Sequence, residues 1–151
     1  AIYAADCSKK LRGMGGACNN IGVYLQTNRF HAERGSANPQ GSIRFEIPTN
    51  DTVYISKAAI SILDRIYIPD IPFKRAGVWL GEIVPACSVI PSLFETQESI
   101  RNKSARSLLM KAVDNINFGF GTPVLKLASQ ITSGHPGHND GYSSTFQAPP
   151  K

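Results

Sequence analysis

Basic and aromatic side chains alternate with apolar ones in three short segments of this chain. The segments read VYLQTNRF from residue 23, SIRFEIP from residue 42 and FKRAGVWLGE from residue 73. Guanidinium and ammonium groups can bind phosphate oxygens whatever the base sequence, and aromatic rings can pack on sugars or bases. A strand glycine can admit a nucleic-acid backbone close to its peptide N–H. The candidate contacts for an anionic polymer are Tyr24, Arg29, Arg44, Lys74, Arg75, Gly77 and Trp79.

Each of these residues also has a structural interpretation that needs no ligand. The strand cations could be solvated surface charges, and Arg29 could belong to a turn that begins at Asn28. Tyr24 could be an ordinary cross-strand partner, and Gly77 could mark a β-bulge. For Trp79 we expect burial by another element or by a second copy of the chain, because outward-facing Trp side chains are usually covered.

Residues that could support catalysis or hold a metal do not form a convincing cluster. His135, His138 and Asp140 have a spacing that could hold a metal, but their segment is rich in Gly and Pro and has no further ligand nearby. The sequence contains no Walker, nucleophile-elbow or zinc-ribbon motif. We therefore predict no cofactor and no catalytic residue. The three cysteines are an odd number without metal-type spacing, which fits a reducing, cytoplasmic compartment.

The overall composition favours one globular domain with an anionic partner. The chain has 151 residues, of which 42% are hydrophobic and 18% charged, and its formal net charge is +5. This length can bury a core without disulfides, and the positive charge makes nucleic acid the first candidate partner. No apolar run is long enough to cross a bilayer, and no helix combines a basic face with a strongly apolar one. We therefore expect no membrane partner.

The pattern of apolar residues predicts an α+β fold. Strands are expected near residues 20–28, 42–48 and 73–83, because apolar and polar residues alternate there. Residues 84–94 are expected to be extended, and residues 124–128 to form a short strand. The expected architecture is a two-layer sandwich, in which helices cover one face of a largely antiparallel sheet.

Helices are predicted over residues 3–14, from a cap at residues 49–51 to residue 67, and over residues 98–116. Basic clusters on the first and third helices are interpreted mainly as solvated faces: Lys9, Lys10 and Arg12, and then Arg101, Lys103 and Arg106. The apolar stripes expected to face the core are Tyr3, Cys7, Leu11 and Met14, then Ile55, Ala59, Ile62 and Ile66, and then Leu108, Leu109, Ala112, Val113 and Ile116.

A series of segments occurs in an order that matches a known family over residues 4–128. The segments are Lys10-Leu11-Arg12, VYLQTNRF, FEIPTNDT, KAAISILDRIY, FKRAGVWLGEI, Ser92-Leu93-Phe94 and LLMKAVDNIN-FGFGT. Their order resembles the C-terminal part of the UmuC-like branch of the Y-family translesion DNA polymerases. The resemblance implies that residues 1–95 form the DNA-binding little finger and residues 96–132 a helical extension with a short strand. Residues 133–151 are rich in Gly, Pro and Ser and have no periodicity, which predicts a flexible tail.

The resemblance also implies that catalysis and DNA binding are located in different parts of the parent protein. The family's polymerase active site lies in the palm, upstream, so this fragment is expected to grip primer–template duplex during error-prone bypass of DNA damage in the SOS response, without being an enzyme itself. The family's little finger opens with a strand before its first helix, whereas this chain starts inside that helix. The sheet would then expose an edge at which two copies could pair as a homodimer.

The family often carries a Gln-Leu-x-Leu-Phe peptide that binds the sliding clamp. The corresponding segment here, IPSLF, keeps the final Leu-Phe and lacks the Gln, which makes Ile90, Leu93 and Phe94 the candidate clamp contacts. Through the parent protein, the resemblance further implies a UmuD-like subunit and RecA as partners.

Two functions of other classes stay open. A protein-interaction module would use the exposed sheet edge and residues 89–94 to bind a clamp or an accessory subunit. An RNA binder resembling the RNA-recognition motif would need stacking aromatic residues on two central strands, and only Tyr24 and Trp79 meet this condition.

Overall fold

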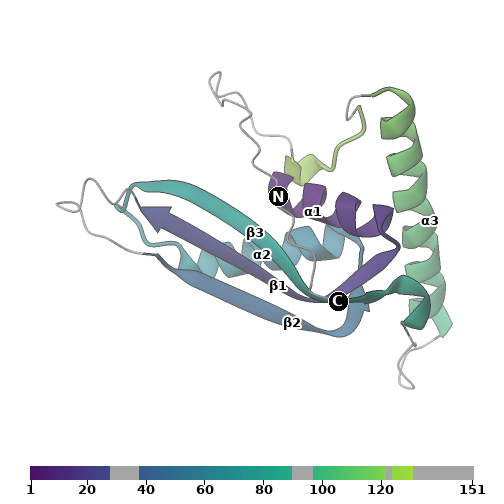
Figure 1. Ribbon diagram of the computed structural model, residues 1–151, viewed down its shortest axis with the longest axis horizontal. Helices are drawn as coiled ribbons and strands as arrows, with labels where there is room; N and C mark the ends of the chain where they lie inside the picture. Colours follow the sequence, from purple (N-terminus) through teal and green to yellow (C-terminus); the bar gives the residue numbers. More distant parts are fainter. Residues whose placement is uncertain (28–37, 90–96, 122–123, 131–151) are drawn as a thin grey trace.

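The computed structural model of the chain describes residues 1–27, 38–89, 97–121 and 124–130 (Figure 1). Two short 3-10 turns, Ala86–Ser88 and Ala128–Gln130, follow the last strand and the last helix. The helices and strands, in chain order, are α1 (Ile2–Gly13), β1 (Gly16–Thr27), β2 (Gln40–Thr49), α2 (Thr52–Ile66), β3 (Phe73–Pro85) and α3 (Gln97–Gly119).

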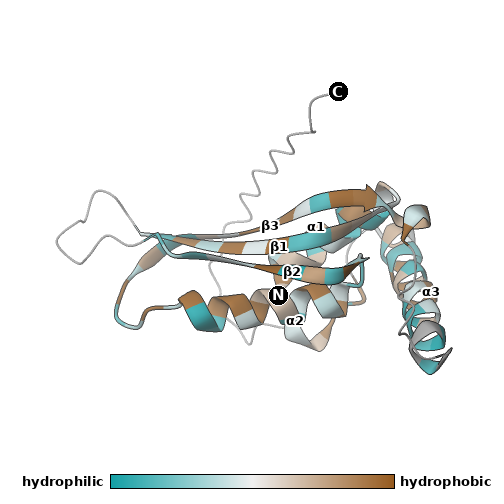
Figure 2. Cartoon of the chain, turned by 90° about the horizontal axis from the view of Figure 1, so that it is seen from below, coloured by the Kyte–Doolittle hydropathy of each residue, from teal (hydrophilic) through white to brown (hydrophobic). Residues whose placement is uncertain are grey.

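The strands form an antiparallel sheet in the order β2-β1-β3, and helices α1 and α2 pack on one of its faces. Figure 2 shows α2 running along that face. The core between the layers joins Ile21 and Val23 of β1 to Leu11 of α1 and Ile55 and Ile62 of α2. The α+β sandwich expected from the sequence is confirmed, and in the described residues the sheet has three strands.

Helix α2 follows the sequence prediction closely. The Asp51 carboxylate accepts a hydrogen bond of 2.8 Å from the Val53 backbone N–H, which satisfies one of the free donors at the start of the helix. The helix ends at Ile66, before Pro69. Of its predicted stripe, Ile55, Ala59 and Ile62 are buried, and Ile66 packs against the core.

Helix α1 buries only part of the stripe predicted for it, because Leu11 is buried and Cys7 half-buried while the two ends of the stripe are exposed. Tyr3 and Met14 are 39% and 52% exposed, whereas Ala4 and Ser8 are completely buried. The Ser8 hydroxyl donates a hydrogen bond of 2.7 Å to the Ala4 carbonyl, so its burial leaves no unmet donor. The prediction is confirmed for Leu11 and wrong for Tyr3 and Met14, because large apolar side chains dominated it, while α1 also packs on α2 and the sheet through small residues.

Helix α3 also turns a different face to the rest of the molecule. The apolar stripe predicted to point inward is largely exposed: Leu108 by 68%, Leu109 by 57% and Ile116 by 41%. Among the side chains of α3 whose burial the structure describes, Met110 and Asn117 are the buried ones. Figure 1 shows α3 running across one end of the sandwich, rather than on the face of the sheet.

The segment after α3 forms no strand in its described residues, so the strand expected over residues 124–128 is wrong. The Asn117 side chain fixes this segment instead. Its amide nitrogen donates to the Leu125 carbonyl at 2.9 Å, and its amide oxygen accepts from the Leu125 N–H at 2.8 Å. The two bonds occupy the backbone groups of Leu125 that a sheet partner would use. The segment expected to be extended, residues 84–94, begins as the end of strand β3, which runs to Pro85, and continues as a 3-10 turn. From residue 90 onward this segment lies outside the described residues, and so does the predicted tail.

Candidate nucleic-acid interface

Cross-strand pairing arranges the residues of the sheet face that α1 and α2 do not cover. Because Ile21 and Val23 of β1 point into the core, alternation directs Asn20, Gly22 and Tyr24 to the opposite face. We call this the open face. Its rows, read from β2 through β1 to β3, are Arg44–Asn20–Gly81, Ser42–Gly22–Trp79, Gln40–Tyr24–Gly77 and, on β1 and β3 only, Gln26–Arg75.

Trp79 lies across the neighbouring strand, over Gly22. A Cβ atom at Gly22 would overlap the indole atoms Cε2, Cζ2 and Nε1, so only glycine leaves room for the ring there. These three atoms are consecutive in the ring and almost equally far from that point, which is how a ring face, rather than an edge, meets a backbone. The side chain remains 43% exposed. The burial expected for Trp79 is therefore wrong for the single chain, in which no described helix covers it.

Tyr24 repeats this arrangement in the opposite direction. It projects from β1 over Gly77 of β3, and a Cβ atom at Gly77 would overlap its Cε1, Cζ and hydroxyl oxygen. Tyr24 is 37% exposed. The presence of glycine at position 77 is therefore explained by the space that the tyrosine ring needs, which the sequence did not suggest. The register shift that indicates a bulge in β3 lies elsewhere, between the pairs Gln26–Arg75 and Thr27–Phe73.

The basic residues of β3 lie at the far end of the open face. Arg75 pairs with Gln26, is exposed and has no ion-pair partner among the described residues. Lys74 is also exposed and is the extra residue at the register shift, so strand alternation does not fix its direction. Of the predicted phosphate contacts in the described residues, Arg75 is the one that the strand pairing places on the open face with its charge uncompensated.

Arg44 lies at the other end of the open face and is paired. Its Nη2 lies 2.9 Å from Oε2 of Glu82, and the two side chains are 71% and 45% exposed. Glu82 has a φ of 51°, in the left-handed region that disfavours residues with a Cβ atom. Glu82 was not among the residues predicted from the sequence, although WLGEI contains an acidic residue directly after a strand glycine.

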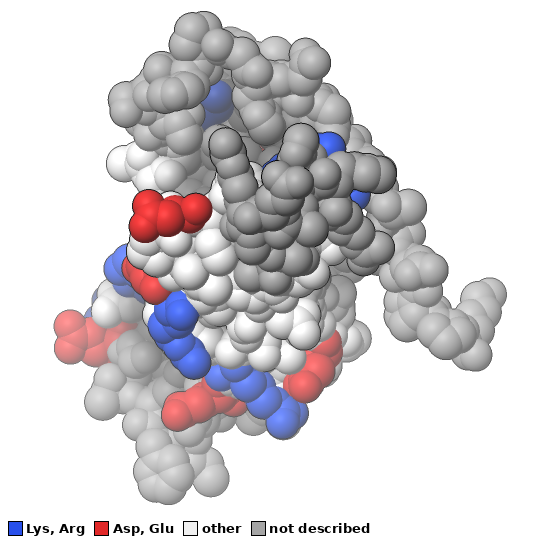
Figure 3. All heavy atoms as spheres, turned by 90° about the vertical axis from the view of Figure 1, so that its left-hand side faces the viewer, with Lys and Arg blue, Asp and Glu red and all other residues white. Residues whose placement is uncertain are grey.

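Basic and acidic side chains are mixed on one side of the molecule. On the side of the molecule shown in Figure 3, Lys and Arg side chains lie among Asp and Glu side chains. A nucleic acid that approached this side would therefore meet separate positive positions rather than a broad positive field.

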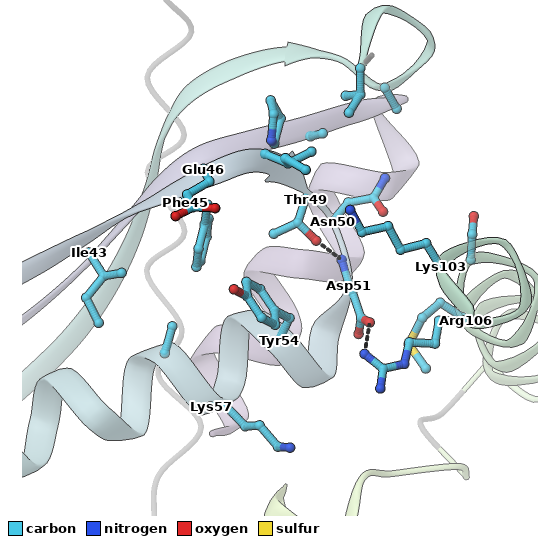
Figure 4. Close-up of a pocket in the computed structure, with 18 of the residues that line it drawn as sticks. Ile43, Phe45, Glu46, Thr49, Asn50, Asp51, Tyr54, Lys57, Lys103 and Arg106 are labelled. Atoms are coloured by element: carbon cyan, nitrogen blue, oxygen red, sulfur yellow. Dashed lines mark hydrogen bonds and ion pairs between the residues drawn. The ribbon is translucent and has the colours of Figure 1, made fainter. Parts of the chain in front are cut away.

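A hollow beside the outer strand β2 is lined by β2, α2 and α3 (Figure 4). The rings of Phe45 and Tyr54 lie 5.3 Å apart on one side of it. On the other side, Nη1 of Arg106 on α3 lies 3.8 Å from Oδ2 of Asp51. The hollow mixes apolar, acidic and basic groups, and Asp51 is already engaged as the cap of α2, so we do not assign chemistry to it.

The described residues contain no helix that could cross a membrane and no group of three metal-ligating side chains. Several predicted positions fall outside the described residues: Arg29, the candidate clamp contacts Ile90, Leu93 and Phe94, and the His135–Asp140 segment with its two histidines.

Comparison with known proteins identifies the family. The sequence profile of the impB/mucB/samB family C-terminal domain matches residues 1–93. The chain belongs to this family. The match confirms the resemblance to the C-terminal region of UmuC-like, Y-family proteins that the order of segments predicted.

Individual family members show the same relationship. Protein SamB of Salmonella typhimurium is 30% identical over 115 residues, which cover 76% of this chain and 26% of SamB. Protein UmuC of Salmonella typhimurium strain LT2 is 30% identical over 128 residues, which cover 85% of this chain and 30% of UmuC. Protein ImpB of Salmonella typhimurium is 26% identical over 115 residues. The chain thus spans less than a third of the length of these relatives.

Proposed function

We propose that this chain is the non-catalytic, little-finger region of an error-prone translesion DNA polymerase, and that its open face grips primer–template duplex through backbone contacts. The observation that carries the proposal is the match of residues 1–93 to the family's C-terminal domain, together with a sheet that leaves one face uncovered by described helices. Because the match is to the C-terminal domain, the proposed role is to hold DNA and not to catalyse nucleotide transfer.

Arg75 is the residue from which this proposal can be tested most directly. A protein that neutralises phosphates releases counterions, so the logarithm of its affinity falls linearly with the logarithm of the salt concentration, with a slope set by the number of contacts. The test measures fluorescence anisotropy of a labelled primer–template duplex at several salt concentrations. We expect micromolar, sequence-independent binding, and Arg75→Ala should reduce the slope by about one.

The matched control is Arg65→Ala, which removes the same charge from an exposed position on α2, the helix that covers the opposite face. The control should bind with the unchanged slope. Absence of salt-dependent duplex binding by the unaltered chain would refute the proposal, and so would an equal loss of slope in the two variants.

Partners of the parent protein are also part of the proposal. Sliding-clamp binding through Ile90, Leu93 and Phe94, and contacts with a UmuD-like subunit and RecA, stay predictions. A protein-interaction module is the second candidate, because in the order β2-β1-β3 both outer strands have a free edge in the described sheet. Clamp binding that is lost in the double variant Leu93→Ala and Phe94→Ala, in a chain that does not bind DNA, would favour this candidate.

A further inference from the structure

The open face presents two aromatic rings in neighbouring rows, each with one side against a glycine and the other turned outward. We propose that Trp79 and Tyr24 form a stacking platform for unpaired bases, so that the open face binds single-stranded DNA, such as a template overhang, in addition to duplex backbone. This inference rests on the proposed function for the identity of the polymer. It adds a ligand class and two ligand-contacting residues.

The rings are held in position before any ligand arrives. Trp79 lies on Gly22, and a Cβ atom at Gly81 would come within 3.0 Å of its Cζ3, so two glycines make room for one indole. Tyr24 is accommodated by Gly77 in the same way. Ring packing over a strand glycine stabilises a sheet, but that role uses only the inner face of each ring. Trp79 remains 43% exposed and Tyr24 37% exposed, and pre-ordered side chains lose little entropy when a ligand binds.

The spacing of the rows favours an unpaired strand over a duplex. The pairs Gly22–Trp79 and Tyr24–Gly77 are two residues apart along β1, which corresponds to about 7 Å in an antiparallel strand. Successive bases of duplex DNA are separated by about 3.4 Å, and each base face is covered by its neighbours. Two rings in separate rows can therefore stack only on bases that have left the continuous stack, as bases in single strands do.

The charge next to the platform supplies a backbone contact. Arg75 and Gln26 form the next row beyond Tyr24 on the same face. A strand whose bases stack on the rings would therefore have a cation and an amide near its phosphates. Positive charge beside aromatic rings is the usual composition of surfaces that bind single strands without reading their sequence.

Trp79 is the only tryptophan of the chain, so its fluorescence reports on the platform alone. The experiment titrates the full chain with an oligothymidylate of about 12 nucleotides, and separately with a blunt duplex of the same length, at low salt. Stacking of a base on the indole should quench its emission with the single strand, and the duplex should leave it nearly unchanged. Trp79→Leu should weaken single-strand binding roughly 5- to 150-fold, measured by anisotropy, and should weaken duplex binding by a much smaller factor.

Three further variants keep the test independent of folding defects. Trp79→Phe retains a ring and should keep most of the single-strand affinity, whereas Gly77→Ala should displace the Tyr24 ring and weaken it. Phe118→Leu removes an aromatic ring that is 86% exposed on α3 and should have no effect on single-strand binding.

The outcomes separate this inference from the proposed function. Salt-dependent duplex binding without quenching by the single strand, or an equal loss of both affinities in Trp79→Leu, would overturn the platform and leave the duplex grip intact. Absence of binding to either DNA would overturn the proposed function together with the platform.

Discussion

Arg12 and Asp114 form a two-pronged ion pair across 102 residues of sequence. Nε of Arg12 donates to Oδ2 of Asp114 at 2.6 Å, and Nη2 donates to Oδ1 at 2.9 Å. Nη1 of the same arginine donates to the Asn50 carbonyl and to the Thr52 hydroxyl, at 2.8 and 2.6 Å. The side chains of Arg12 and Asp114 are only 11% and 24% exposed. One guanidinium thus joins the end of α1, the start of α2 and the middle of α3, and is not the solvated charge expected from the sequence.

Removing Arg12 should therefore destabilise the fold strongly. Arg12→Ala leaves a largely buried carboxylate, the Asn50 carbonyl and the Thr52 hydroxyl without their donor, which typically costs about 3 kcal/mol of unfolding free energy. Urea denaturation measures this loss. The control Arg101→Ala removes an exposed charge from α3 and should cost less than about 0.5 kcal/mol. Equal stability of the two variants would show that the ion pair does not hold α3 in place.

Truncation of two neighbouring residues of α3 should lower the free energy of unfolding by very different amounts. Met110 is 5% exposed, so Met110→Ala should cost about 2–3 kcal/mol of unfolding free energy through lost burial and the resulting cavity. Leu109 is 57% exposed, and Leu109→Ala should change stability by less than about 0.5 kcal/mol. Urea denaturation of both variants gives the comparison. A larger cost for Leu109→Ala would mean that α3 buries the stripe predicted from the sequence.

Glu82 combines a strained backbone with a charge that neutralises Arg44, and two substitutions separate these effects. Glu82→Gln keeps the strain at a φ of 51° and removes the charge, whereas Glu82→Gly removes both. The glycine variant should therefore be more stable in urea than the glutamine variant by about 1 kcal/mol. If the glutamine variant were equally or more stable, the left-handed conformation would not be costly at this position.

The same two variants should bind duplex DNA more tightly than the unaltered chain, because both release Arg44 from its carboxylate partner. An exposed ion pair is worth up to about 1 kcal/mol, so the gain should be at most about fivefold at low salt. Anisotropy titration measures this gain. The double variant Glu82→Gln with Arg44→Ala should lose it; a gain that persists there would come from the removed negative charge alone.

Cys18 should make the stability of the protein fall at high pH. The side chain is completely buried, and burial raises the pKa of its thiol from about 9 to about 11. The folded state therefore keeps the proton at pH values where the unfolded state has released it. The resulting stability is fully present below pH 9 and is lost as the pH rises through 11. Two pKa units correspond to about 2.7 kcal/mol.

Cys18→Ser provides the comparison, because a hydroxyl can still donate to the Thr49 carbonyl, which lies 3.4 Å from the thiol sulfur, but does not titrate in this range. The difference in unfolding free energy between the unaltered chain and this variant should shrink by about 2.3 kcal/mol between pH 8 and pH 11. A difference that does not depend on pH would show that the thiol of the folded state ionises normally.

The sequence correctly placed Tyr24, Gly77 and Trp79 on one face of a sheet, because alternation along a strand is local and has a fixed period of two. The relationships between them could not be read in the same way. That Trp79 lies over Gly22, and Tyr24 over Gly77, depends on the register between β1 and β3, which joins residues more than 50 positions apart. The sequence does show a glycine and an aromatic residue on the same face of each strand. Without the register, however, it does not show which glycine lies opposite which aromatic residue.

The sequence by itself determined the alternation of the strands, the stripe and cap of α2, and the order of segments that identifies the family. Each of these is local, or is a matter of order along the chain. Only the tertiary structure decided which face α1 and α3 bury. Small residues on α1 allow close packing. Helix α3 is held by ion pairs with Arg12 and Asp51, which belong to distant segments of the chain. Helical periodicity shows where apolar residues recur around a helix, but the buried face is the one for which the rest of the chain supplies complementary surface and charge.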